Sequence, residues 1–315
     1  MKIRGAALLS TALWVFILFS GCNSSDKASS KSDLEDDGYP VQLFGETLPE
    51  APSNVAVLSP SLAEIIYDMG YGSTLLGRSE ECDYPEAVTE LPTAGSILLP
   101  DMDVLIKWKP DLVLTQKDPS DSIKKLLKDN GIPFLVIPPA QTYNDLLTVY
   151  QSIGKIYSGS KDGLAKGQAY FGALNNALGE ITQTILVESV KKPLNAVYIT
   201  DSFGHVATGD TVIHHILEAA GAINIAENHK EWTAESQTFH TVDIIFCPET
   251  LTDKVKGISG FAGSPAVKNK KVYGIDNAAI ERQSKRMAEA AREMAGAMYP
   301  NSFTAIESSQ TTLIP

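Results

Sequence analysis

Short apolar runs alternate with amphipathic segments along most of the chain after Pro52. An apolar run bounded by turn residues predicts a buried strand, and apolar residues every three or four positions predict a helix. The predicted strands are residues 55–58, 75–78, 112–114, 134–137, 196–199, 244–246 and 271–275, and the predicted helices are residues 60–69, 101–107, 120–130, 211–220 and 284–298. This alternation is typical of α/β folds with mainly parallel sheets.

The alternation is interrupted by residues 143–190, which contain no proline and carry apolar side chains at helical spacing. A helix of this length would span roughly 45 Å or more at 1.5 Å per residue, longer than one small lobe. We expect a break near Ser158-Gly159-Ser160. The prediction is an α/β protein with two α/β lobes, residues 53–142 and 191–302, whose central, mainly parallel sheets are joined by one long backbone helix. Ligands of such sheets sit beyond the carboxyl ends of the strands, so we expect a ligand cleft between the lobes.

The N-terminus has the pattern of an export signal. Lys2 and Arg4 precede an apolar run of about 14 residues, whereas a transmembrane helix needs roughly 20. Residues 1–21 are therefore predicted to be a signal peptide. Ser20 and Gly21 stand directly before Cys22, as in a bacterial lipobox, although Phe19 replaces the usual leucine.

Cys22 is accordingly predicted to become the diacylated first residue of the mature protein. Residues 23–37 are rich in serine and aspartate, with one large apolar residue, Leu34. Such a segment buries too little apolar surface to offset its ordering entropy. We expect residues 22–52 to form a lipidated N-terminus and a disordered linker. The mature body would then be extracytoplasmic and lipid-anchored to the bacterial membrane, at the cell surface or in the periplasm.

The composition excludes several classes of function. A net charge of -12 and a pI near 4.9, with scattered basic residues, exclude nucleic acid as a partner. No CxxC pair or His-x3-His spacing is present, so no metal site and no resident cofactor are predicted. Beyond the leader, Cys82 and Cys247 favour two separate buried thiols, although a bridge between them stays open.

Motifs of catalysis are missing as well, and we predict that the chain is not an enzyme. The sequence has no P-loop, no GxGxxG fingerprint and no Gly-x-Ser-x-Gly elbow. One alternative is a lipid-anchored enzyme, hydrolase or chelatase-like, on a similar two-lobed fold, which would need a Ser, His and carboxylate cluster. Another is a free-metal-ion receptor, which would need His and carboxylates at several strand ends, where only His205 lies.

Four segments, taken in order, resemble a known family. They are VAVLSPSLAEIIYDMGYGSTLLGRSEECDYPEAVTELPTAGS, DMDVLIKWKPDLVLTQ, ATGDTVIHHILEAAGAINIAENHKEW and AIERQSKRMAEAAREMAGAMYP. Together they resemble the iron-siderophore, heme and vitamin B12 class of periplasmic binding proteins. The resemblance covers about residues 54–302 as one binding domain.

This resemblance implies a substrate-binding lipoprotein of an ABC transporter. Such a protein captures a metal chelate (a ferric siderophore, heme or cobalamin) and delivers it to a permease dimer with its ATPase subunits. We expect a monomer. The shared fold leaves the ligand within that group open, and the envelope type of the host as well.

The resemblance also implies two carboxylates that dock on the transporter. The first falls on Asp103, an aspartate where the family usually has glutamate. The second position holds Thr238, so Glu235 is the candidate substitute in a shortened segment. The residues predicted to line the ligand cleft lie at strand ends or in the loops that follow them: Ser59, Ser61, Arg78, Asp83, Tyr84, Phe203, His205, Trp232 and Arg282.

Overall fold

The computed structural model describes residues 38–187, 192–230, 232–233 and 240–303. Cys22 and Glu235 lie outside the described residues. Among those that are described, no helix is long and apolar enough to cross a membrane.

The first lobe is built on a parallel sheet in the order β4-β3-β5-β6. All three residues of β3 and all four of β5 are buried, as continuous apolar runs predict for strands covered on both faces. The strands are Val55–Val57 (β3), Leu75–Arg78 (β4), Leu112–Thr115 (β5) and Phe134–Val136 (β6), and the helices around them are Pro60–Asp68 (α1), Glu86–Thr89 (α2), Met102–Trp108 (α3) and Asp121–Asp129 (α4), with a 3-10 turn at Gly72–Thr74.

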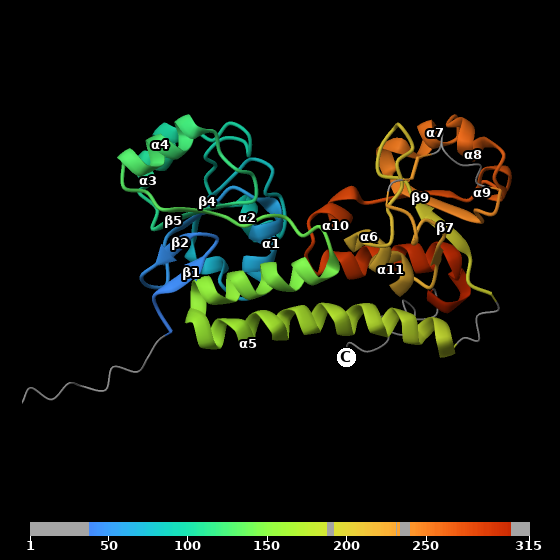
Figure 1. Ribbon diagram of the computed structural model, residues 1–315, viewed down its shortest axis with the longest axis horizontal. Helices are drawn as coiled ribbons and strands as arrows, with labels where there is room; N and C mark the ends of the chain where they lie inside the picture. Colours follow the sequence, from blue (N-terminus) through green and yellow to red (C-terminus); the bar gives the residue numbers. More distant parts are fainter. Residues whose placement is uncertain (1–37, 188–191, 231, 234–239, 304–315) are drawn as a thin grey trace, which may run out of the picture. The chain divides into compact units, whose positions relative to one another are not determined.

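The second lobe repeats this plan with a parallel sheet in the order β10-β9-β7-β8. Its central strand β9 is buried throughout. The strands are Asn195–Tyr198 (β7), Ile223–Asn224 (β8), Ile244–Pro248 (β9) and Val272–Ile275 (β10), and the helices are Val212–Ala219 (α6), Thr252–Val255 (α7), Ser259–Ala262 (α8), Pro265–Lys268 (α9), Asn277–Glu281 (α10) and Arg286–Met298 (α11), with a 3-10 turn at Glu249–Leu251. The predicted α/β class with parallel sheets in two lobes is confirmed (Figure 1).

Local sequence signals fix where the helices begin. Ser59 caps α1 by accepting a hydrogen bond from the Leu62 amide, and Pro60 occupies the first helical position. Asp101 caps α3 in the same way through the Val104 amide. These caps place the start of each helix directly after a strand or loop, so that the polar cap residues lie at the carboxyl edge of the sheet.

The connecting helix α5, Tyr143–Val187, is not one straight rod. Its backbone leaves the helical region at Ser158 and at Gly159, where φ is 73°, so the expected break near Ser158-Gly159-Ser160 is confirmed. The two arms then pack against each other: a Cβ on Gly154 would come within 2.1 Å of the Gly163 carbonyl oxygen. The segment is therefore a helical hairpin, and only its second arm continues beyond the first.

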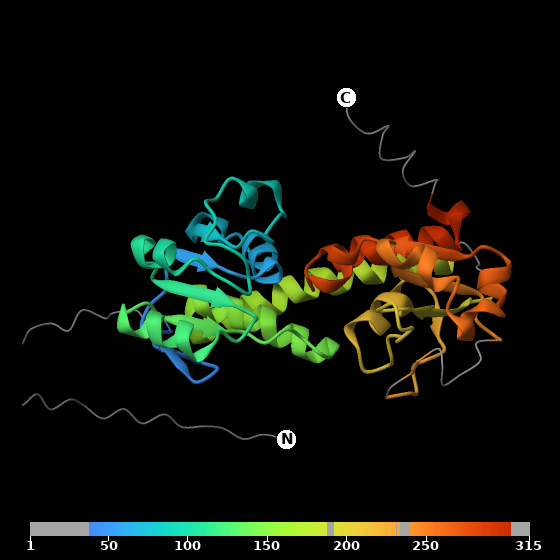
Figure 2. The same ribbon diagram turned by 90° about the horizontal axis from the view of Figure 1, so that it is seen from above.

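The helical hairpin contacts both lobes. As a whole, α5 contacts α1 and β1 in the first lobe and α6 and α11 in the second lobe (Figures 1 and 2). Thr182 donates to the Ala219 carbonyl, and Ile185 lies against Gly221. The 28 residues from 160 to 187 span about 42 Å at 1.5 Å per residue.

The end of the expected linker is ordered, which corrects the prediction of disorder through residue 52. Val41–Leu43 (β1) pairs antiparallel with Glu46–Leu48 (β2), and Val41 and Leu48 are buried. Phe44 and Gly45 form the two-residue turn with φ of 49° and 88°, as in a type I′ hairpin. This hairpin contacts α5, so the folded body begins before Pro52.

Cys82 and Cys247 are both free and buried, one in each lobe. The interpretation as two separate thiols is confirmed. Burial raises the pKa of both thiols, so neither carries the thiolate that a nucleophile needs.

Candidate functional site

The candidate site consists of the loops that follow the carboxyl ends of the strands in both lobes. Parallel strands deliver these loops to one edge of each sheet, where ligands of open α/β sheets bind. The residues predicted as ligand contacts fall into three groups there. Some are buried supports of the first lobe, some join the two lobes, and some are exposed in the second lobe.

Ser59 and Ser61 belong to the buried supports. Ser59 is 3% exposed, caps α1 and donates from its hydroxyl to Gln116 Oε1 at 2.7 Å. Ser61 is also buried, within the first turn of α1. The Ser59 hydroxyl therefore fixes the loop after β3.

Arg78, at the end of β4, is bonded to the backbone of its own lobe. Its Nη1 donates to the carbonyls of Ser79 and Glu80, at 3.1 and 3.3 Å, and its Nη2 donates to the Thr89 carbonyl at 3.1 Å. The guanidinium thus ties the loop after β4 to the end of α2.

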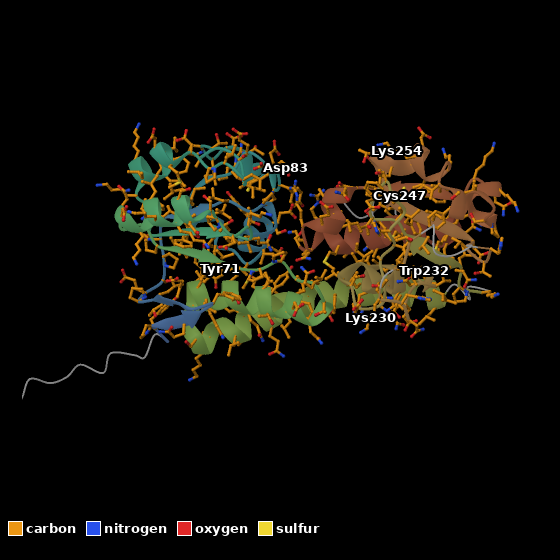
Figure 3. The ribbon with its side chains drawn as sticks, turned by 45° about the horizontal axis from the view of Figure 1, so that its top comes forward. Tyr71, Asp83, Lys230, Trp232, Cys247 and Lys254 are labelled. Carbon is orange, nitrogen blue, oxygen red and sulfur yellow. The ribbon has the colours of Figure 1, made fainter. Side chains whose placement is uncertain are left out.

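A group of four charged residues and one serine joins the two lobes, and we name it the junction cluster: Glu64, Asp83, Arg282, Ser284 and Arg286. Arg282 comes directly after α10, and its Nη1 contacts Glu64 Oε1 at 3.2 Å and the Asp83 carboxylate. Figure 3 labels Asp83 in the first lobe. Arg286 Nη1 reaches the same Glu64 oxygen at 3.3 Å, and Ser284 donates to the other oxygen.

Burial and charge act in opposite directions on the carboxylates of the junction cluster. The side chain of Glu64 is only 1% exposed. Its burial raises its pKa, while the hydrogen bonds from Ser284 and Arg282 and the charge of Arg286 partly oppose that rise. Asp83 is exposed, and the hydrogen bond from Arg282 holds its pKa below the usual range. Both carboxylates are thus matched to arginines of the second lobe.

Neighbouring contacts extend this junction. Arg286 also pairs with Asp276, and its guanidinium lies 4.7 Å from the centre of the Tyr84 ring. Lys285 Nζ lies 2.9 Å from Asp68 Oδ1 at the end of α1. Gln283 exchanges two hydrogen bonds with the Ala140 backbone. Asp83, Tyr84 and Arg282, all predicted as ligand contacts, are therefore brought together here.

A different arrangement occurs in residues 200–206, which follow β7 and which we name the rim loop. Asp201 Oδ2 lies 2.6 Å from His205 Nδ1, and its Oδ1 accepts from the amides of Phe203 and His205 at 2.9 and 3.2 Å. The Phe203 side chain points outward and is 75% exposed. The rim loop therefore presents an aromatic ring and an oriented imidazole to solvent.

Trp232 lies near the rim loop but is mostly buried. It is 8% exposed, belongs to the second lobe's apolar core, and stacks on His229 with ring centres 4.5 Å apart. Val206 donates from its amide to the Trp232 carbonyl at 3.1 Å. Figure 3 labels Trp232 in the second lobe. Trp232 is thus joined to the rim loop through its backbone, while its ring packs in the core.

The first lobe contributes apolar surface at the same edge of its sheet. A cavity of about 250 Å³ is lined by Leu58, Thr115 and Phe134 and by the loop that carries Leu98 and Leu99. Leu98 and Leu99 are 67% and 78% exposed. Such exposed leucines next to a cavity are typical of a surface that receives an apolar ligand or partner.

The described residues hold no group of three or more His, Cys, Asp or Glu side chains placed to bind a metal ion. Asp103, the predicted docking carboxylate, is exposed in the first turn of α3. Four residues that shape the site were missed from the sequence: Glu64, Asp201, Ser284 and Arg286. Two had a signal, since Glu64 interrupts the apolar face of α1 and Asp201 precedes His205 by four positions.

The profile of the periplasmic binding protein family matches residues 55–279, and the chain belongs to this family. The resemblance inferred from the four sequence segments is confirmed. A crystal structure of a possible iron-binding (periplasmic solute-binding) protein from Staphylococcus epidermidis has the same fold, with a TM-score of 0.66, 24% identity, and coverage of 79% of this chain and 100% of that one.

Three curated relatives extend over most of the chain. The uncharacterized ABC transporter substrate-binding lipoprotein YvrC of Bacillus subtilis is 27% identical, over 96% of this chain and 99% of its own length. The Fe(3+)-citrate-binding protein YfmC of the same species is 23% identical, over 86% and 89%. A cobalamin-binding protein of Halobacterium salinarum is 22% identical, over 87% and 76%.

Proposed function

We propose that this chain is the substrate-binding lipoprotein of an ABC importer and that its ligand is a corrinoid, a metal macrocycle without net negative charge. The protein would capture the ligand outside the cytoplasm and deliver it to the permease. The choice of ligand rests on one observation: the arginines at the candidate site are already bonded to groups of the protein.

An anionic chelate needs basic side chains that are available to it. Arg78 is bonded to three backbone carbonyls, and Arg282 and Arg286 are paired with Glu64, Asp83 and Asp276. A carboxylate-rich ligand would have to displace these protein partners, which would leave Glu64 buried without its counter-charges. Ferric citrate and heme, whose propionates are charged, are therefore disfavoured.

A corrinoid suits the exposed groups better. Its side chains are mainly uncharged amides, and its ring offers a broad, partly apolar face. Phe203 in the second lobe and Leu98 and Leu99 in the first lobe offer apolar surface at the edges where ligands of this fold bind. The cobalamin-binding relative supports the same class of ligand, and the Fe(3+)-citrate-binding relative supports the anionic alternative.

Among the predicted contacts, we propose Phe203 and His205 as direct ligand contacts, with Asp83 and Tyr84 at the edge of the junction cluster. Ser59, Ser61, Arg78, Trp232 and Arg282 have supporting roles within the protein, and their contact with ligand stays a prediction.

We further propose a binding role without catalysis. The rim loop pairs His205 with Asp201, but no serine or cysteine hydroxyl or thiol is hydrogen-bonded to that imidazole among the contacts of the described residues. A hydrolase of the triad type needs such a nucleophile within reach of the base.

The remaining parts of the proposal concern attachment and delivery. Cys22 would carry the lipid, and the folded body from Tyr39 onward would stay tethered at the membrane surface. Asp103 would meet a basic residue of the permease. Glu235 is the candidate for the second lobe, and it lies outside the described residues.

A binding panel tests the proposed ligand. We expect the purified mature protein to bind cyanocobalamin with micromolar or tighter affinity, about -8 kcal/mol or better, and to bind ferric citrate and hemin at least tenfold more weakly. Tryptophan fluorescence and calorimetry measure these affinities. Binding of ferric citrate more tightly than cyanocobalamin would overturn the charge argument and favour the anionic class.

A further inference from the structure

The rim loop holds one imidazole in a fixed orientation. Asp201 accepts three hydrogen bonds, from the His205 ring and from the amides of Phe203 and His205. The loop is closed by the Thr200 amide, which donates to the His205 carbonyl at 2.9 Å, and by a bridge between Ile199 and Val206. The position of the ring is therefore set by backbone as well as by its carboxylate partner.

This geometry determines which nitrogen of His205 is available. A carboxylate can only accept, so the proton lies on Nδ1, which is 2.6 Å from Asp201 Oδ2. Burial alone would raise the pKa of Asp201, but the hydrogen bonds from His205 and Phe203 outweigh it and keep the pKa below the usual value. The neutral ring then has its lone pair on Nε2, and the side chain is 52% exposed.

Other histidines of the described chain are differently placed. His214 is buried, with Nδ1 near Asn224 and Nε2 3.3 Å from Glu218. His215 lies on α6 beside the Tyr143 ring. His205 differs because an outward nitrogen is combined with a carboxylate behind the ring, the arrangement that metal-binding histidines commonly have.

We propose that His205 Nε2 is an axial ligand to the metal of the bound macrocycle, namely the cobalt of a corrinoid with an exchangeable axial water. This inference rests on the proposed function and adds a bond between His205 Nε2 and the metal of the ligand. The water leaves the cobalt as the Nε2 lone pair forms the cobalt–nitrogen bond, and the oxidation state of the metal does not change. The Nδ1 proton stays in its hydrogen bond to Asp201, and this hydrogen bond makes Nε2 a better electron-pair donor to the metal. Phe203 would lie along the ring beside the metal.

The test compares two corrinoids that differ in the exchangeability of one axial ligand. Aquocobalamin carries an axial water that imidazole replaces with a shift of the visible bands, whereas cyanocobalamin carries a tightly held cyanide. We expect the mature wild-type protein to shift the bands of aquocobalamin on binding and to leave those of cyanocobalamin in place. His205→Ala should abolish the shift and weaken aquocobalamin binding at least tenfold more than cyanocobalamin binding.

Two further variants locate the effect. Asp201→Asn should weaken aquocobalamin binding by about tenfold, the size typical of a lost outer-shell partner. His215→Ala removes a half-buried imidazole outside the rim loop and should leave both affinities and the band shift unchanged.

The outcomes separate the inference from the function on which it rests. If wild-type protein binds both corrinoids without a band shift, or if His205→Ala weakens both equally, ligation by His205 is refuted and the corrinoid proposal stands. If wild-type protein binds neither corrinoid, the proposed ligand is wrong, and the inference falls with it.

Discussion

The junction cluster and the rim loop use the same kinds of side chain for opposite purposes. In the junction cluster, Glu64 is buried, and two arginines of the other lobe are directed at it. In the rim loop, Asp201 is partly exposed, and its partner is an imidazole whose second nitrogen faces outward. Charge is neutralised in the first region, whereas in the second a carboxylate orients a ring for contact with something else.

This difference teaches that a strand-end position alone does not define a ligand contact. Arg282 follows helix α10 and His205 lies in the loop after β7, and their neighbours determine their roles. A buried carboxylate such as Glu64 requires its counter-charges permanently. An exposed carboxylate such as Asp201 stabilises its partner without enclosing it. The following predictions test the contrast, beginning with the largest expected effect.

Removing Glu64 should damage the junction most. Glu64→Ala removes the buried carboxylate that Arg282 and Arg286 both contact, and each arginine keeps only its more exposed partner, Asp83 or Asp276. Breaking a buried ion pair costs about 3–5 kcal/mol. We expect the free energy of unfolding in urea to fall by that amount. Glu64→Gln, which keeps the shape and some hydrogen bonds, should lose less. A loss below about 1 kcal/mol for Glu64→Ala would mean that the junction cluster is not a buried ion-pair network in solution.

The helical hairpin tests the support beneath the junction. A methyl group on Gly154 would meet the backbone of the opposite arm at 2.1 Å, so Gly154→Ala should cost about 1–3 kcal/mol by overpacking. Gly172 lies in the same helix with nothing within 4 Å of its added Cβ. Gly172→Ala should therefore stabilise the protein by about 0.5–1 kcal/mol through helix propensity. Equal effects of the two substitutions on the thermal midpoint would show that the arms do not pack closely.

The sequence predicts the elements whose pattern is long or strongly apolar. The strands around Val55, Leu112 and Ile244 and the long helical segment from Tyr143 are where periodicity places them. Short elements were missed, because helices such as Thr252–Val255 have only one turn and no periodicity to read. The β1–β2 hairpin was missed for the same reason, since each strand has three residues and its turn is Phe-Gly instead of Asn-Gly.

The candidate site was predictable in position but not in partners. The local pattern predicts that Asp83, Arg282 and His205 lie in loops beyond the strands, and their contact with a ligand stays a prediction. The pairing of Arg282 with Glu64 joins residues 218 positions apart, and no local pattern reveals such a contact. Burial of Glu64 is likewise a tertiary property. The sequence therefore could not separate the arginines that hold the lobes from the side chains that remain exposed.

The smallest predicted effect concerns the pH dependence of the exposed member of the junction cluster. The hydrogen bond from Arg282 lowers the pKa of Asp83 below its ordinary value of 3.8, so the folded chain binds a proton there less readily than the unfolded chain. The stabilisation from Asp83 is therefore complete above about pH 3.8 and is lost as the pH falls through the lower, folded-state pKa. An exposed pair of this kind is worth about 0–1 kcal/mol at neutral pH.

Asp83→Asn should accordingly lower the free energy of unfolding by at most about 1 kcal/mol at pH 7, with the difference from wild type vanishing in strong acid. Glu64→Gln serves as the contrast. Burial raises the pKa of Glu64 above 4.5, so the folded chain binds a proton there more readily than the unfolded chain does. The stabilisation that comes from this proton is therefore lost as the pH rises above 4.5 and through the raised pKa. Urea unfolding of the three proteins from about pH 2 to pH 7 should show opposite trends for the two variants relative to wild type. If the stability differences of both variants change with pH in the same direction, Glu64 and Asp83 are equally exposed to solvent. The distinction between a buried carboxylate and an exposed one would then be wrong.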